Sequence, residues 1–233
     1  MKFNCLIVGE SGVGKTPLAA TLADCEQTQP CLFLDVDAGS MSIITEPKPT
    51  IFEIDTWSQV QKIYTLLRDQ KWEELAKLVV TEQPLEYKSV VIDSGTELEY
   101  KLRKHVMSET GSSEMPEQRD YLICQERFRS LYRKFRDLPL TIVMTAGVRD
   151  LKEDISGIVK YYPAFQPGLT RDLVRMTDLV LFMDVKSEDK KWLRVLQTQI
   201  TQRVVARDRS QKLSAQIRGE KLFFKDIVKE MIK

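Results

Sequence analysis

The chain has 233 residues, a formal net charge of +1, 42% hydrophobic residues and 30% charged residues. This composition is that of an ordinary folded protein, and the length suits one large domain over residues 1–233 better than two. Apolar runs of about six residues and no secretory leader exclude a membrane partner and favour the cytoplasm. Four cysteines without a Cys-x-x-Cys pair and a single histidine, His105, argue against disulfides, zinc and a Ser-His triad.

The first predicted element is an apolar strand over residues 3–8, and a helix is expected over 18–24. Between them lies the pattern of a phosphate-binding P-loop, formed by Gly9, Glu10, Ser11, Gly12, Val13, Gly14, Lys15 and Thr16. Glycines let backbone N–H groups converge on phosphate, Lys15 would reach the β- and γ-phosphates, and Thr16 would offer its hydroxyl to Mg²⁺. Pro17 falls in the first helical turn, where a missing N–H costs little. The stretch predicts binding of ATP with Mg²⁺.

Two further predicted strands end in carboxylates. The strand over 31–37 ends in Asp35 and Asp37, and the strand over 89–94 contains Asp93 after a run of aliphatic residues, the form of a Walker B segment. In that role Asp93 would hold the Mg²⁺ shell opposite Thr16. Between them we expect a short strand over 51–54 and a helix from Thr56 to about residue 78. Either Thr56 or Ser58 would cap this helix, and Gln70-Lys71 would interrupt it.

Helices are next predicted over 95–108 and 117–137, and the second has an apolar core face and a solvated basic face. A strand over 140–147 follows, and Thr145 at its carboxyl end would lie beside the nucleotide. Residues 147–170 read as a long flexible loop with aromatic and basic residues. Two interpretations stay open for this loop: an element that stacks the bases of single-stranded DNA, or a flap that packs on the body.

The last part of the chain predicts a short helix over 171–176, a strand over 178–183, an antiparallel neighbour over 192–196 and a final helix over 222–232. The alternation of strands and helices indicates an α/β fold, a doubly wound and mostly parallel sheet with a C-terminal antiparallel edge hairpin. The segment 186–233 holds 13 Lys or Arg against 6 Asp or Glu. It is either a phosphate-contacting surface or a set of solvated lysines.

Four strings in this order resemble RecA-like P-loop ATPases, and most closely the small phage-encoded Sak-type ATPases of single-strand annealing and recombination. They are the P-loop Gly-Glu-Ser-Gly-Val-Gly-Lys-Thr, Phe33-Leu-Asp35-Val-Asp37-Ala-Gly-Ser, Val90-Val-Ile-Asp93-Ser94 and Ala206-Arg207-Asp208-Arg209. The last is similar to a Lys-x-Arg string that many RecA-like enzymes carry before the final helix, with arginine in place of lysine.

The resemblance implies a RecA-like fold, ATP hydrolysis and a division of catalytic roles. Asp37 would activate the attacking water, although RecA-like proteins normally have glutamate there, and the shorter side chain predicts slow turnover. Thr145 would sense the γ-phosphate. Arg207 and Arg209 would reach the γ-phosphate of a neighbouring subunit in a homo-oligomeric ring or filament. A local surface ion-pair cluster is the alternative for these arginines.

The resemblance further implies a bacteriophage protein in the cytoplasm of a bacterial host. It would act in DNA recombination or single-strand annealing, with single-stranded DNA and a single-strand-binding protein as candidate partners. Two other functions stay open: a small-molecule kinase, and a nucleotide-gated assembly protein with little turnover. A GTPase is disfavoured because the chain has no Asn-Lys-x-Asp string.

Overall fold

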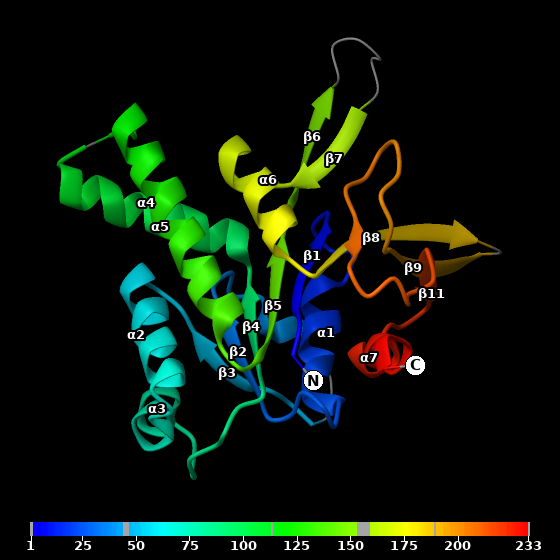
Figure 1. The fold of residues 1–233 in the computed structure, drawn as a ribbon, viewed down its shortest axis with the longest axis horizontal. Helices are drawn as coiled ribbons and strands as arrows, with labels where there is room; N and C mark the ends of the chain where they lie inside the picture. The colour runs from blue at the N-terminus through cyan, green and yellow to red at the C-terminus, as the bar shows by residue number, and fades with distance from the viewer. Residues whose placement is uncertain (1, 44–46, 113, 153–158, 189, 233) are drawn as a thin grey trace.

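The computed structural model describes residues 2–43, 47–112, 114–152, 159–188 and 190–232. Its main feature is one sheet, in which the strands follow the order β11-β9-β8-β1-β5-β4-β2-β3, with β10 paired to β8 (Figure 1). These strands are β1 (Asn4–Gly9), β2 (Cys31–Asp35), β3 (Thr50–Glu53), β4 (Ser89–Asp93), β5 (Thr141–Ala146), β8 (Leu179–Glu188), β9 (Lys191–Gln197), β10 (Arg207–Asp208) and β11 (Gln216–Gly219). The run from β8 to β3 is parallel, whereas β9, β10 and β11 pair antiparallel. The predicted parallel sheet with an antiparallel C-terminal edge is confirmed.

Helices cover both faces of this sheet (Figure 1). They are α1 (Lys15–Ala20), α2 (Trp57–Arg68), α3 (Trp72–Val79), α4 (Gly95–Thr110), α5 (Gln118–Asp137), α6 (Pro167–Met176) and α7 (Phe224–Ile232). Side chains of β1 alternate between two cores: Leu6 and Val8 pack with α2 to α6, whereas Cys5 and Ile7 pack with α1 and α7. All of β1 is buried, which explains why its sequence is a continuous apolar run.

The helix expected over residues 56–78 is two helices. A capping box starts α2, in which the Gln59 side chain accepts a hydrogen bond from the Thr56 N–H (2.9 Å). Gln70 then adopts a positive φ of 53°, which no continuous helix contains, and α3 begins at Trp72. Of the two predicted caps, Thr56 is the one that the structure shows, and the predicted interruption at 70–71 is confirmed.

The segment 147–170 is not the loop that the sequence suggests. Its described part forms an antiparallel hairpin, β6 (Val148–Lys152) with β7 (Val159–Pro163), and α6 begins at Pro167. Residues 153–158 lie outside the described residues. The sequence hides the hairpin because charged residues interrupt the expected alternation of apolar and polar positions. Tyr161 packs on the body, with its ring centroid 6.0 Å from that of Phe182, as one of the two interpretations of this segment expected.

The hairpin is attached to α4 at both of its ends. At the start, the Gly147 N–H donates to the Thr96 hydroxyl (3.1 Å). After its end, the Gln166 N–H donates to the Glu99 carboxyl group (3.3 Å), and Glu99 is only 5% exposed. Since α4 directly follows β4, the hairpin is connected to the strand that carries Asp93.

Burial raises the pKa of Glu99 to about 7, so the folded protein binds a proton that the unfolded chain releases above about pH 4.5. The proton on Glu99 therefore stabilises the folded protein by on the order of 3 kcal/mol. This stabilisation is fully present below pH 4.5 and is lost as the pH rises through 7. We expect Glu99→Gln, compared with the wild type by urea unfolding, to be increasingly stabilising between pH 5 and pH 8. Glu97→Gln on the same helix is the control, and an equal pH dependence in wild type and Glu99→Gln would contradict the assignment.

No helix in the described part of the chain is both long and apolar enough to cross a lipid bilayer. The cysteines Cys5, Cys25, Cys31 and Cys124 are all buried free thiols.

Candidate functional site

The loop between β1 and α1 has a backbone that only glycine accommodates at three positions. Gly12 and Gly14 have φ values of 80° and 106°, in the left-handed region. A Cβ at Gly9 would lie 2.5 Å from the Met183 carbonyl oxygen of the neighbouring strand β8. The glycines of the predicted P-loop are therefore required by this structure, and the loop leads directly into α1, as the sequence predicted.

Lys15 lies inside the loop. Its Nζ donates to the carbonyl oxygens of Gly9 and Glu10, both at 2.8 Å. Burial lowers the pKa of Lys15, and the charges of Asp93, Asp37 and Glu10 oppose this shift. The cation is thus placed among the predicted site carboxylates, with backbone carbonyls as its hydrogen-bond partners.

Asp93 ends β4 and is 2% exposed. Its Oδ1 accepts a hydrogen bond from the hydroxyl of Thr145 on the adjacent strand β5, whereas Oδ2 is buried and has no hydrogen-bond partner within the described residues. Burial raises the pKa of Asp93, as do Asp37 and Asp35, while the hydroxyls of Thr145 and Thr16 lower it. A buried carboxylate oxygen without a partner requires an explanation, and a bound cation provides one.

The surroundings of this oxygen suit Mg²⁺. A Cβ placed on Gly39 would lie 3.9 Å from both Asp93 Oδ2 and Thr16 Oγ1, so these two oxygens face the same small space. Mg²⁺ prefers oxygen ligands and is usually bound by one or two carboxylates together with water and substrate phosphates. The described residues contain no group of three or more His, Cys, Asp or Glu that could hold a metal alone. Thr16 and Asp93 therefore fit a metal that is shared with a phosphate substrate.

The two carboxylates after β2 have different environments. Asp35 is buried and accepts the N–H groups of Gly39 (2.9 Å) and Ser40 (3.0 Å), so it stabilises the turn after the strand. Asp37 is exposed, and its N–H donates to the Asp93 carbonyl oxygen (3.2 Å). Of the two, Asp37 is the one with an exposed side chain, and its role as the base stays a prediction.

Thr145 and the late arginines have structural partners that the sequence did not reveal. Thr145 holds Asp93, so the structure gives it a positioning role, and its contact with a γ-phosphate stays a prediction. Arg207 donates to carbonyl oxygens at the end of α6, and Arg209 pairs with Asp178 (2.9 Å) just before β8. These contacts lie at the amino-terminal edge of the parallel strands, whereas the P-loop lies at the opposite edge. Neither arginine therefore reaches the P-loop of its own chain. The local ion-pair interpretation describes Arg209, and action on a neighbouring subunit stays a prediction.

Sequence reasoning missed Arg194 and the cavity beside it. A pocket of about 740 Å³ lies between α1 and the segment that joins β11 to α7. Its apolar lining comes from Pro17, Leu18, Met183, Leu222 and Phe223. The pocket also reaches Gly14 and Arg194 and so continues from the P-loop. No sequence signal marks Arg194, which is one of many basic residues after position 186.

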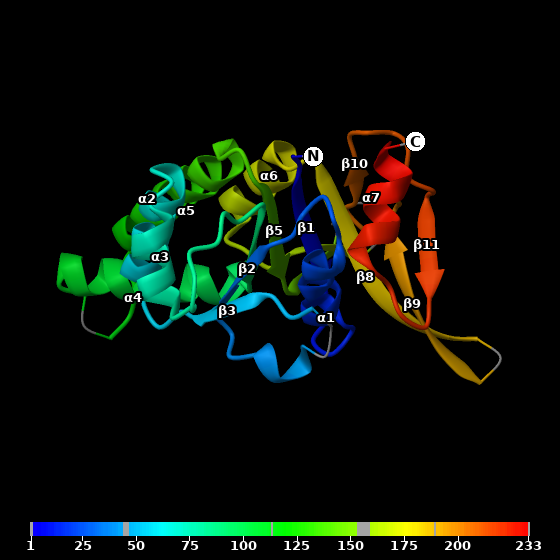
Figure 2. The ribbon, with the colours of Figure 1, turned by 90° about the horizontal axis from the view of Figure 1, so that it is seen from below.

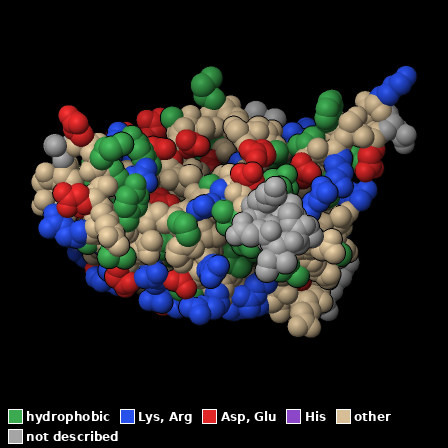
Figure 3. All heavy atoms as spheres, turned by 90° about the horizontal axis from the view of Figure 1, so that it is seen from above, with side chains coloured by type: hydrophobic (Ala, Val, Ile, Leu, Met, Phe, Trp, Pro, Cys, Tyr) green, Lys and Arg blue, Asp and Glu red, His purple; other side chains and the backbone are tan. Residues whose placement is uncertain are grey.

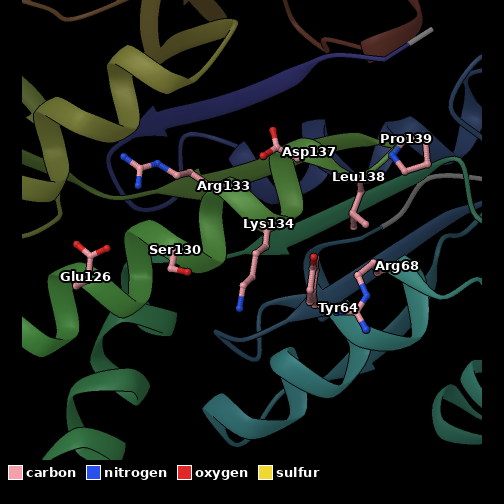
Figure 4. Close-up of a pocket in the computed structure, with 9 residues that line it drawn as sticks. All are labelled: Tyr64, Arg68, Glu126, Ser130, Arg133, Lys134, Asp137, Leu138 and Pro139. Carbon is pink, nitrogen blue, oxygen red and sulfur yellow. The ribbon is translucent and has the colours of Figure 1, made fainter.

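A second hollow lies elsewhere, between α2 and α5 (Figure 4). It measures about 370 Å³, and Arg68 and Lys134 flank the Tyr64 ring, 5.8 and 5.9 Å from its centroid. Leu138 and Pro139, which precede β5, also line it, so it lies near the amino-terminal edge of the sheet. This hollow is separate from the P-loop and Asp93.

A family model described as an AAA domain matches residues 1–210, most of the chain. No curated protein matches the chain. The match covers β1, the P-loop and the strand ends that carry Asp37, Asp93 and Thr145. The chain therefore belongs to this AAA-domain family and has the fold of a P-loop nucleoside triphosphatase.

Proposed function

We propose that this protein binds ATP with Mg²⁺ at the loop 9–16 and hydrolyses it. The observation that carries this proposal is the position of Asp93 Oδ2, which is buried and without a hydrogen-bond partner among the described residues. It faces the same space as the Thr16 hydroxyl, beside a glycine loop that contains Lys15. A cation, a triphosphate and a lysine meet in this way in P-loop enzymes. The 740 Å³ pocket, which starts at Gly14 and has an apolar lining, suits the nucleoside half of the substrate.

Each residue of this site would have a role that follows from its position. Backbone N–H groups of the loop and the Lys15 ammonium would stabilise the charge that develops on the phosphates. Thr16 and Asp93 would hold Mg²⁺, which when bound neutralises charge on the β- and γ-phosphates. Thr145 keeps the Asp93 carboxylate oriented through its hydrogen bond. Asp37, exposed at the end of β2, would orient the attacking water and accept its proton.

Asp37→Asn removes the proposed base without changing side-chain size. We expect ATP affinity to remain within about twofold and turnover to fall roughly 10²- to 10⁴-fold, the range for general-base catalysis. Calorimetry gives the affinity and phosphate release gives the rate. Normal turnover in Asp37→Asn would assign the base to another group.

For the biological task, we propose DNA recombination or single-strand annealing, with single-stranded DNA bound at the β6–β7 hairpin. A hollow of about 320 Å³ there is lined by Arg149, Tyr162 and Arg171, and Lys160 lies 5.9 Å from the Tyr162 ring centroid. Cations beside a partly exposed aromatic ring suit a phosphate backbone with stacked bases. A single-strand-binding protein is a further candidate partner.

Basic residues elsewhere support DNA binding less well. Figure 3 shows Lys and Arg side chains along one edge of the molecule seen from above. On α5 and α6, however, Arg129 and Arg175 both pair with Asp172 (2.7 and 3.0 Å), and Arg136 pairs with Asp137 (2.7 Å). Arginines already paired with carboxylates have less charge to offer to phosphates, so we place DNA at the hairpin.

Phosphate release with and without single-stranded DNA tests this task. Stimulation that is lost in Arg149→Ala/Arg171→Ala but kept in Arg133→Ala on α5 would support it. Phosphoryl transfer to a metabolite would favour the kinase alternative, and ATP binding without turnover would favour the assembly protein.

We also propose a homo-oligomer, a ring or filament in which Arg207 and Arg209 meet a neighbour's γ-phosphate. Because both arginines lie far from their own P-loop, any contact that they make with a γ-phosphate would have to be made between subunits. Sedimentation with a non-hydrolysable ATP analogue tests this assembly, and a monomer at all protein concentrations would contradict it.

A further inference from the structure

The side chain of Arg194 extends from β9, at the antiparallel edge of the sheet, to the P-loop. A Cβ added to Gly14 would lie 2.7 Å from Arg194 Nε and 3.4 Å from its Cδ. The guanidinium group therefore packs directly on the backbone of Gly14, the residue before Lys15. Any side chain at position 14 would displace it. The absence of a side chain there serves both the left-handed turn and the approach of this cation.

The position of Arg194 is fixed by the strands around it. It lies on β9, between Val185 of β8 and Gly219 of β11 in the register of the sheet. Both neighbouring strands hydrogen-bond to β9, so the Cα of Arg194 cannot shift without disturbing three strands. Figure 2 shows how these strands extend the sheet at its edge. A side chain on such a framework is well suited to precise contacts.

The guanidinium group has a neutral partner. Its Nη1 donates to the backbone carbonyl oxygen of Glu220, whereas the Glu220 carboxylate pairs with Lys191 (2.9 Å). Within the part of the chain that the structure describes, no carboxylate forms a salt bridge with Arg194, although its side chain is half-buried. A half-buried arginine bonded to a carbonyl, next to a loop built for anions, is suited to receive an anion.

We propose that Arg194 is a nucleotide-binding residue that contacts the α- and β-phosphates from within the same chain. This inference rests on the proposed function, because it assumes a nucleotide in the loop. Backbone N–H groups of a P-loop cradle the α- and β-phosphates, whereas its lysine reaches the β- and γ-phosphates. Arg194 therefore lies at the end of the loop away from Asp93, where the 740 Å³ pocket begins. Arg194 binds both ATP and ADP. When either nucleotide is bound, hydrogen bonds to phosphate oxygens replace the hydrogen bond to the Glu220 carbonyl oxygen.

The test compares Arg194→Met and Arg194→Lys with the wild type by calorimetric titration of ATP and ADP. A hydrogen bond to a charged group predicts that Arg194→Met weakens both nucleotides about 10- to 100-fold. Arg194→Lys should recover part of this loss, because it keeps the charge without the forked geometry. Arg218→Met on β11, which removes an arginine that pairs with Glu188 (3.1 Å), is the matched control and should bind normally.

A purely structural role has a different signature. If Arg194 only holds the 219–223 segment, the Met and Lys variants lose affinity equally, and both lower the melting temperature of the nucleotide-free protein. That result would overturn the inference, as would normal affinity in Arg194→Met. A wild-type protein that binds no ATP, or binds it equally well after Lys15→Ala, would instead refute the proposed function.

Discussion

Lys15→Ala is expected to reduce ATP hydrolysis by at least roughly 10³-fold, to the background of the assay. The ammonium group lies inside the loop, bonded to Gly9 and Glu10, and no other cation of the described chain occupies that place. A preorganised charge at the developing negative charge of the transition state contributes roughly 10²- to 10³-fold per donor, and Lys15 also orders the substrate. Steady-state phosphate release measures the effect.

Two controls make the Lys15→Ala test specific. Lys62→Ala removes an exposed lysine from α2, on the opposite side of the sheet, and should leave turnover unchanged. Melting temperatures of both variants show whether the fold is intact. Turnover that persists in purified Lys15→Ala would mean that hydrolysis takes place elsewhere or belongs to a contaminant.

Asp93→Asn should lower turnover by roughly 10²- to 10³-fold. The substitution keeps size and an oxygen for Thr145 but removes the charge that Mg²⁺ requires. Because burial already raises the pKa of Asp93, a neutral side chain should be tolerated by the fold. Thermal unfolding should therefore change little, and the concentration of Mg²⁺ for half-maximal activity should rise.

The control for Asp93→Asn is Asp120→Asn, a buried carboxylate in the capping box of α5, far from the loop. This variant should lower stability and leave the rate per folded molecule unchanged. If Asp93→Asn lost stability in the same way and kept its rate, Asp93 would be a structural residue like Asp120.

The sequence was most informative where one local pattern has one physical solution. The glycines of the loop were predictable because their backbone angles and close contacts exclude side chains, and the apolar runs of β1, β4 and β5 were predictable because both faces of those strands are buried. Asp93 followed from its position at the end of such a strand.

Other features depend on contacts between distant segments, which local patterns do not encode. The β6–β7 hairpin carries charged residues on strands that are only partly buried, so it read as a loop. Arg194 acquires its place only when β9 joins the sheet beside β8 and meets Gly14, 180 positions earlier. Likewise, the partners of Arg209 are Asp178 and the carbonyl oxygen of Arg175 at the end of α6, and no local pattern links these residues.

A crystal structure with Mg²⁺ and a non-hydrolysable ATP analogue tests the central claim most directly. The account predicts a triphosphate within residues 9–16, with Lys15 Nζ moved from the Gly9 and Glu10 carbonyl oxygens to phosphate oxygens and the metal next to Thr16 and Asp93. An analogue bound elsewhere at saturating concentration, with Lys15 still on those carbonyl oxygens, would contradict it.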